Sequence, residues 1–191
     1  MMKRSLRLGL SLLILTAVAG CGLAASPDSG SDWKQVLHDR LSEYGHRNWI
    51  VIADSAYPAQ TNPGIETVVS HEDQPTVLRE VLSSLQQSKS VRPIFYLDKE
   101  LKYVDEDSVP GIEAFRTQLM DQLESQKPKT MLHEQLINKL DQVSKTFKVL
   151  IIKTNLTIPY TTVFIELRAS YWGDDAEKAM RVRMSKDKAA K

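Results

Sequence analysis

Apolar residues recur at intervals of three and four positions in four segments of the chain, and this spacing predicts four amphipathic helices. In the first segment Trp33, Leu37 and Leu41 would share one helix face. Pro75 suits the first turn of the second helix, where its missing N–H costs nothing. The predicted helices cover residues 33–44, 75–85, 112–123 and 132–143.

Between and after these segments, short apolar runs rich in β-branched residues predict five strands. They cover residues 49–55, 64–70, 92–97, 147–155 and 161–169. We expect residues 102–111 to form a polar connection and residues 126–130 to form a turn. Strands that alternate with helices predict a single α/β domain, with a mainly parallel sheet on which the helices pack.

The first 21 residues have the pattern of an export signal. Lys3, Arg4 and Arg7 precede an uncharged apolar stretch over 8–20, which is shorter than the roughly 20 residues that span a bilayer. The stretch ends in "AVAGC" and resembles a bacterial lipoprotein signal, which implies cleavage before Cys21 and lipidation of that cysteine. An ordinary signal peptide cut elsewhere and an uncleaved anchor are the alternatives. Since Cys21 is the only cysteine, no internal disulfide can form.

The signal sets the expected organisation of the whole chain. Residues 22–31 have the small, polar composition of a flexible tether, residues 32–172 form the domain, and residues 173–191 form a charged tail that we expect to be solvated or frayed. The protein would be exported and lipid-anchored to the cell envelope, at the periplasmic face of a bacterial membrane. Gly22, rather than Asp, follows the cysteine, which by analogy with enterobacterial sorting favours the outer membrane.

Charge indicates little about partners. Without the three basic residues of the signal, 22 Lys and Arg face 24 Asp and Glu, so the net charge falls from +1 to about −2. No basic stripe with interleaved aromatic residues occurs, and we therefore expect no nucleic-acid partner. A membrane-surface role for the basic residues after Ala179 is a weaker alternative to a solvated tail.

Two residues flank the first predicted strand. Asp54 follows "IVIA" at the carboxyl end, where ligands bind in open α/β sheets, but an aspartate there can also cap the following turn. His46 follows Gly45 before the strand, where an isolated histidine is more often structural. The other candidates are His133, which either caps a helix or serves a site, and Tyr160, which either packs or donates a hydrogen bond.

Other chemistries have little support in the sequence. The four histidines are scattered, without a His-x-x-x-His pair, so we expect no metal site. No glycine-rich phosphate loop occurs, so we expect no nucleotide cofactor. Ser55 follows Asp54 but lacks a G-x-S-x-G elbow, which argues against a nucleophilic serine.

The stretch "LSEYGHRNWIVIADSAYPAQ" resembles the opening motif of the D-ribose pyranase and L-fucose mutarotase (RbsD/FucU) family. Members carry Gly-His, a hydrophobic strand, an Asp eight residues after the histidine, and then an aromatic-Pro segment, as His46 and Asp54 do here. "IPYTTVFIEL" resembles the second motif, with Tyr160 in place and Thr162 where Asn is expected. "HEQL" at His133 resembles a histidine that opens a helix, but it lies several residues farther from the tyrosine.

The resemblance, over about residues 41–167, implies a mutarotase or pyranase that interconverts the cyclic forms of an aldose without a cofactor. It implies His46 as the acid/base, Asp54 as the residue that holds sugar hydroxyls, and Tyr160 and Thr162 as the rest of the pocket. His133 would be a second contact or proton carrier. It also implies a ring-like homo-oligomer with the cleft between subunits. A sugar-binding lipoprotein without catalysis and a structural adaptor remain alternatives.

The spacing of the first motif sets a geometric condition. Eight residues of extended chain would separate His46 and Asp54 by roughly 20–25 Å. They can share one pocket only if residues 45–48 fold back, or if a neighbouring subunit supplies one of them.

Overall fold

The computed structural model describes residues 32–189, so the predicted signal, Cys21 and the tether lie outside the described residues. The elements in chain order are α1 (Trp33–Glu43), β1 (Trp49–Ala53), β2 (Ile65–Val69), α2 (Gln74–Gln87), β3 (Val91–Asp98), the 3₁₀ helix η1 (Lys99–Tyr103), α3 (Ile112–Leu123), η2 (Glu124–Gln126), β4 (Lys129–Met131), α4 (His133–Val143), β5 (Val149–Lys153), β6 (Val163–Ala169) and α5 (Asp174–Ala189). All four predicted helices and all five predicted strands are present. None of the described helices has both the length and the apolar character to cross a membrane.

Six strands form one sheet in the order β2-β5-β1-β6-β3-β4. β5 pairs in parallel with β1 and with β2, and β3 pairs in parallel with β4. Only β6 runs against its two neighbours, β1 and β3. The prediction of an α/β domain with a mainly parallel sheet is therefore confirmed, and the carboxyl ends of β1, β3, β4 and β5 all reach the same edge.

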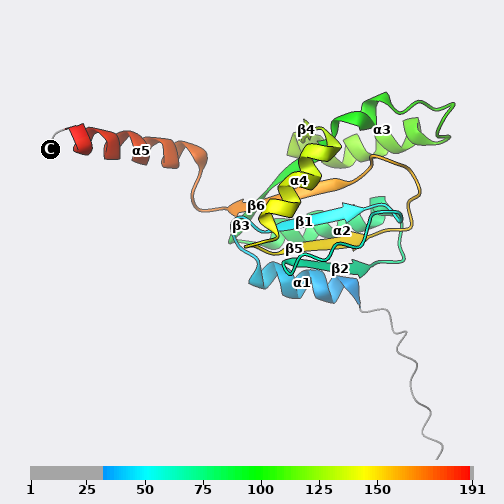
Figure 1. The fold of residues 1–191 in the computed structure, drawn as a ribbon, viewed down its shortest axis with the longest axis horizontal. Helices are drawn as coiled ribbons and strands as arrows, with labels where there is room; N and C mark the ends of the chain where they lie inside the picture. The colour runs from blue at the N-terminus through cyan, green and yellow to red at the C-terminus, as the bar shows by residue number, and fades with distance from the viewer. Residues whose placement is uncertain (1–31, 190–191) are drawn as a thin grey trace, which may run out of the picture.

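Alternate residues of each central strand feed two separate apolar cores. Ile50 and Ile52 of β1 face the core built with α1, α2 and α3, while Val51 and Ala53 face the core built with α4. Only α4 crosses the second face of the sheet (Figure 1). The period-2 alternation of strand side chains thus assigns each residue of "WIVIA" to one of two buried layers, which is why the run is apolar throughout.

Two segments differ from the sequence-based expectation. Residues 126–130, predicted as a turn or short linker, include the first two residues of β4, whose three residues pair with Tyr96–Asp98 of β3 and are too few to produce a periodic pattern. The tail, predicted to be frayed, forms the helix α5, although its side chains are nearly all exposed and it projects away from the domain (Figure 1). Acidic residues in its first turn and an Arg181–Glu177 ion pair of 2.7 Å one turn apart stabilise a sequence that is rich in helix formers.

Candidate active site

The candidate site lies at the edge of the sheet where β1, β3 and β4 end. Asp54 directly follows β1, and Asp98 is the last residue of β3. β4 runs parallel to β3 and leads into α4, whose first residue is His133. Because β6 runs in the opposite direction, Thr162 enters the same edge just before Val163, which pairs with both β1 and β3. Topology alone therefore gathers two carboxylates, an imidazole and a hydroxyl.

A pocket of about 350 Å³ opens over this edge. Its walls are residues 54–58, the side of His133, and residues 157–160 of the loop between β5 and β6. Three of the predicted site residues, Asp54, His133 and Tyr160, thus line one pocket. Their roles toward a ligand remain predictions.

Asp54 has two roles that the sequence left as alternatives. Its Oδ1 accepts a hydrogen bond of 2.8 Å from the backbone N–H of Ala56, which makes the Asx turn after β1. The residue is only half-buried and lines the pocket, so its carboxylate is also open to a ligand. The turn holds the carboxylate in place before any ligand binds.

Tyr160 closes the opposite wall of the pocket. Its ring lies edge-on to the His133 imidazole, with 5.7 Å between ring centroids. The backbone of Tyr160 is in the left-handed region at φ +57°, which is uncommon for an aromatic residue and is typical of sites where the surrounding structure holds a strained conformation. Tyr160 is exposed, so its hydroxyl can reach a ligand in the pocket.

Beneath the pocket, the Asp98 carboxylate approaches the His133 ring. Oδ1 of Asp98 lies 3.1 Å from Nδ1 of His133, and the Asp98 side chain is fully buried (0% exposed). The distance suits a hydrogen bond, although the ring is not aligned along the N–H direction and both groups keep unused hydrogen-bonding capacity. Burial raises the pKa of Asp98, and the neighbouring His133 partly offsets that rise. Contact with Asp98 raises the pKa of His133, against the opposing effect of partial burial.

Buried polar atoms without a partner are concentrated at this edge. Eight buried side-chain N or O atoms of the described residues have no hydrogen-bond partner. Five of these eight belong to four residues of the site: the Tyr57 hydroxyl, both Asp98 oxygens, Nδ1 of His133 and Oγ1 of Thr162. Since native proteins satisfy most buried polar groups, such a cluster is typical of a place where a polar ligand supplies the missing partners.

Tyr57 and Thr162 are both buried at this edge, but only Tyr57 is among the residues that line the pocket. Tyr57 is buried, and its pKa is raised, first by burial and then by the Asp98, Asp141 and Asp54 carboxylates. Thr162 is 1% exposed, and the pairing of Val163 with Leu97 places it beside Asp98. The structure therefore does not bring Thr162 to the surface of the pocket, and its contact with a ligand stays a prediction.

Polar contacts fix the pocket loop at both of its ends. Near β5, the Asn155 side chain donates to the carbonyl of His71 at 2.7 Å, and the Asn155 backbone N–H donates to the carbonyl of Glu72 at 2.9 Å. Near β6, Nε2 of Gln74 donates to the carbonyl of Thr161 at 2.6 Å. The turn before α2 thus holds the loop that carries Tyr160.

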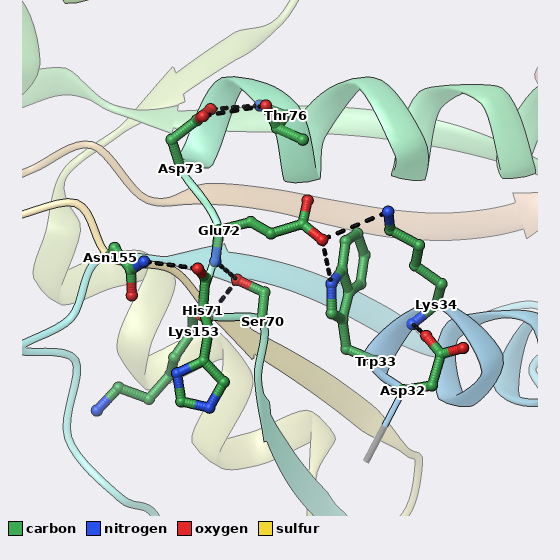
Figure 2. A network of polar contacts seen from close by, with 10 residues as sticks. All are labelled: Asp32, Trp33, Lys34, Ser70, His71, Glu72, Asp73, Thr76, Lys153 and Asn155. Atoms are coloured by element: carbon green, nitrogen blue, oxygen red, sulfur yellow. Dashed lines mark hydrogen bonds and ion pairs between the residues drawn. The ribbon is translucent and has the colours of Figure 1, made fainter. Parts of the chain in front are cut away.

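The same turn is tied to the start of the domain (Figure 2). The Glu72 carboxylate accepts from Nε1 of Trp33 at 3.1 Å and pairs with Nζ of Lys34 at 3.4 Å. Glu72 also donates its backbone N–H to Oγ of Ser70, which in turn donates to the carbonyl of Lys153. One continuous network therefore links α1, the turn after β2 and the end of β5. The same turn contacts the pocket loop through Asn155, so the network helps to fix that loop.

His46 lies at the other edge of the sheet. It precedes β1, whereas Asp54 follows it, and the five residues of β1 span roughly 15 Å. Residues 45–48 form a turn, and His46 is exposed in a separate hollow of about 430 Å³ that Arg47, Arg92 and the first turn of α5 also line. Within one subunit, the structure does not bring His46 to the pocket that holds Asp54, His133 and Tyr160.

Two residues of the site were missed in the sequence. Asp98 directly follows "RPIFYL", just as Asp54 directly follows "WIVIA". The rule that polar residues after buried strands meet at one edge of the sheet would therefore have found Asp98. Tyr57 stood in plain view in the aromatic-Pro segment, but nothing in the sequence shows that its hydroxyl is buried. No group of three or more His, Cys, Asp or Glu side chains within residues 32–189 is arranged to hold a metal ion.

A comparison with known families decides what kind of protein carries this site. Residues 34–168 match the RbsD / FucU transport protein family. The chain belongs to this family. The match begins within α1, ends one residue before the end of β6 and stops before α5. No curated protein matches the chain significantly.

Several solved structures of the RbsD/FucU family are similar to this chain. Bacillus subtilis RbsD, complexed with D-ribose, is 20% identical, with 70% of this chain and 91% of that chain covered and a TM-score of 0.48. The fucose mutarotase of Streptococcus pneumoniae, in complex with L-fucose, is 17% identical, with 75% and 98% covered and a TM-score of 0.48. FucU from Bifidobacterium longum is 14% identical, with 72% and 96% covered and a TM-score of 0.47.

Proposed function

We propose that this RbsD/FucU family member is a monosaccharide mutarotase or pyranase, which interconverts the cyclic forms of a ribose- or fucose-like aldose. The observation that carries the proposal is the convergence of Asp54, His133 and Tyr160 on one pocket. The unpartnered polar atoms in its floor support it, because a sugar offers many hydroxyl groups to such a site.

The reaction needs only proton transfers. One group removes the proton of the anomeric hydroxyl, while another delivers a proton to the ring oxygen as its bond to the anomeric carbon breaks. The open-chain aldehyde then closes again, through the same or another hydroxyl, and the two protons return. No electrons are gained or lost. Histidine suits either transfer because its ordinary pKa is close to neutral pH.

The residues of the pocket divide this work. The Asp54 carboxylate accepts charge-assisted hydrogen bonds from sugar hydroxyls, which orients the ring. Tyr160 offers its hydroxyl from the opposite wall. His133 contacts the sugar and carries a proton. The positions of Asp54, His133 and Tyr160 in the pocket support these roles, whereas Oγ1 of Thr162 is buried and would have to be uncovered to reach the sugar.

His46 joins the site from a neighbouring subunit in this proposal. It is exposed at the opposite edge of its own sheet, so a second copy of the chain can present it to the pocket of the first. A closed ring of identical subunits would repeat the same contact at every interface. His46 then serves as the principal acid/base, and the homo-oligomer is the catalytic unit.

Attachment to a membrane is a separate part of the proposal. Lipidation of Cys21 would place the oligomer at the periplasmic face of the cell envelope, with residues 22–31 as the tether. Mass spectrometry of the N-terminal peptide would detect the lipid. We expect Cys21→Ala to move the protein from the membrane fraction to the soluble fraction, and an unchanged distribution would contradict the anchor.

Saturation-transfer NMR on D-ribose, L-fucose and related aldoses tests the enzyme. The chain without its signal and its lipidated cysteine (residues 22–191) should exchange magnetisation between anomers or ring forms faster than buffer, and His46→Ala should remove most of that effect. Calorimetric binding without exchange would favour the alternative of a sugar-binding lipoprotein, for which Thr162 in place of Asn is the supporting observation. Neither binding nor exchange across the panel would contradict both sugar functions.

A further inference from the structure

Asp98 has a buried position that neither the fold nor the pocket wall explains. Its side chain is fully buried, and both carboxylate oxygens lack a hydrogen-bond partner among the described residues. Within residues 32–189, the only oppositely chargeable group in contact with it is the His133 ring, at 3.1 Å. A buried carboxylate is costly unless it is paired, so this arrangement does not serve stability.

Glu166 provides the internal contrast. It is the other carboxylate buried in the sheet, with its side chain 9% exposed. It accepts from the hydroxyl of Tyr96 at 2.9 Å and from Nε of Arg168 at 2.7 Å, and Nζ of Lys139 lies 4.0 Å away. A carboxylate that stabilises this sheet is therefore surrounded by donors. Asp98, in contrast, is directed at one imidazole.

We infer that Asp98 is a positioning residue: from the observed contact of 3.1 Å, a small rotation of the His133 ring would align Nδ1–H with the Asp98 carboxylate and leave Nε2 to carry a proton in the pocket. This inference rests on the proposed function. It makes His133 an acid/base group that each subunit possesses by itself, in addition to the histidine supplied by a neighbour. The substrate proton would move between the anomeric hydroxyl and Nε2, and it would return to the sugar when the ring closes.

The different exposure of the two sides of the ring supports this direction of transfer. Nδ1 of His133 is buried, while the side chain as a whole is 35% exposed and lines the pocket. Nε2 is then the ring nitrogen that can reach a ligand. A hydrogen bond from Nδ1 to a carboxylate selects the tautomer in which neutral Nε2 accepts a proton, and it stabilises the imidazolium that forms.

The backbone of His133 is fixed independently of its ring. The carboxylate of Glu100 in η1 accepts from the His133 backbone N–H at 3.0 and 3.1 Å, which caps the start of α4. Asp98 therefore has only the rotation of the imidazole to control. Since Glu100 caps the helix, a change at Asp98 should disturb the ring and leave the helix start in place.

The charged and titratable groups around the imidazole are all acidic or phenolic. Asp98 and Glu100 face it from β3 and η1, Asp54 faces it from the turn after β1, and Tyr160 faces it from the pocket loop. The three carboxylates each raise the pKa of His133, and burial opposes them. Removal of the Asp98 charge should therefore lower the pKa of His133.

The test is ¹⁵N NMR of the histidine side chains in the same chain (residues 22–191), recorded without sugar as a function of pH. His133 signals are assigned by their loss in His133→Gln. We expect the wild type to show protonated Nδ1 and unprotonated Nε2 at high pH. In Asp98→Asn, an isosteric change, we expect a mixed or reversed tautomer and a lower titration midpoint. Glu166→Gln is the matched control, and it should leave the His133 signals unchanged.

Kinetics then separate the two proposals. If the wild type accelerates exchange, Asp98→Asn should reduce the rate roughly 10²–10⁴-fold, and the pH limb of the remaining rate should shift with the His133 midpoint. If the wild type shows no exchange, the proposed function fails, and the ring titration alone decides the role of Asp98. A wild type with Nε2 protonated, or an Asp98→Asn variant with unchanged tautomer and midpoint, would overturn the inference.

Discussion

The two halves of the sheet treat buried polar groups in opposite ways. Toward the edge where β1 begins, Glu166 is buried with a tyrosine hydroxyl and an arginine as donors, and Trp49 stacks on Tyr96 at 5.6 Å. At the edge where β1 ends, Asp98, Tyr57 and Thr162 are buried with unpartnered oxygens. In the first half the buried carboxylate has hydrogen-bond donors, as is usual in a protein interior. In the second half the buried oxygens have no hydrogen-bond partner.

This difference teaches where function costs stability. An unpartnered buried polar group lowers the free energy of unfolding by about 1–3 kcal/mol. Such groups persist in native proteins mainly where a ligand or a reaction uses them. Substitutions at the two halves should therefore have opposite effects on stability and activity, and the following expectations are ordered from the largest effect to the smallest.

The largest effect on activity should come from His46 and Asp54, the two motif residues that lie at opposite ends of β1. We expect His46→Ala and Asp54→Ala each to reduce anomer exchange roughly 10²–10⁴-fold, since one removes the acid/base and the other the residue that orients the sugar. A mixture of the two variants, unfolded and refolded together, should regain activity, because about a quarter of the shared sites in a symmetric oligomer would then be intact. The control is each variant refolded alone. No recovery in the mixture would show that His46 does not act in a neighbour's pocket.

The next effect concerns the buried pair beneath the pocket. His133→Ala leaves the Asp98 carboxylate buried without its partner and should lower the free energy of unfolding by about 3 kcal/mol at neutral pH. Urea denaturation measures this change. The double variant Asp98→Asn/His133→Ala should recover most of the loss, and a loss that persists in the double variant would assign it to packing instead.

The same variant should show a distinctive pH dependence. Burial already raises the pKa of Asp98, and loss of His133 removes the group that lowers it, so folded His133→Ala binds a proton at Asp98 more tightly than the unfolded chain does. Its stability deficit relative to the double variant Asp98→Asn/His133→Ala, which lacks both titrating groups, is therefore present above the folded pKa of Asp98 and shrinks as the pH falls through that value. Urea denaturation between neutral pH and pH ~4 would measure the difference. A deficit that is constant with pH would contradict a charged Asp98 as its cause.

Two tyrosines offer a matched comparison of the two halves. Tyr57→Phe removes a buried hydroxyl that has no partner and should raise the free energy of unfolding by about 1 kcal/mol, while it weakens sugar binding. Tyr96→Phe removes a hydroxyl that donates to Glu166 and should lower the free energy of unfolding by about 1.5 kcal/mol. Denaturation and calorimetric titration with sugar would give the four values. Equal signs for the two stability changes would refute the contrast between the halves.

The smallest effect should come from α5. None of its described side chains is buried, and its link to the domain through Arg92 and Asp174 is an ion pair of 2.9 Å at the surface. Deletion of residues 174–191 should therefore change the free energy of unfolding by no more than about 0.5 kcal/mol. A much larger loss by urea denaturation would indicate that α5 packs on the domain or on another subunit.

Much of the fold could be predicted from the sequence because its signals are local. The period-3.6 and period-2 patterns place four helices and five strands, and alternation of the two types predicts the parallel layers. β4 was not predicted because three residues are too few to show a periodic pattern of apolar positions. α5 was not predicted as a helix because its mixed charges are typical of solvated tails, although its residues are good helix formers.

The site divides in the same way. Asp54, His133 and Tyr160 could be named from motifs, and the structure brings them to one pocket. Asp98 could have been found from its place after a buried strand, but its burial against His133, like the burial of the Tyr57 hydroxyl, depends on what packs around it. Thr162 was expected at the pocket, but it is buried and is not among the lining residues, and the strand pairing places it beside Asp98.

The sequence by itself determined most of the elements and the family motif, since each depends on residues within a few positions of one another, and the motifs named three residues of the pocket. Only the tertiary structure decided which polar groups share an edge and which are kept apart. An extended strand separates its own two ends, so His46 and Asp54 lie at opposite edges despite their shared motif. Strand pairing, in contrast, brings Asp98 to His133 across 34 intervening residues. A sequence motif indicates which residues are candidates for a site, and the pairing of the strands determines which of them lie close together.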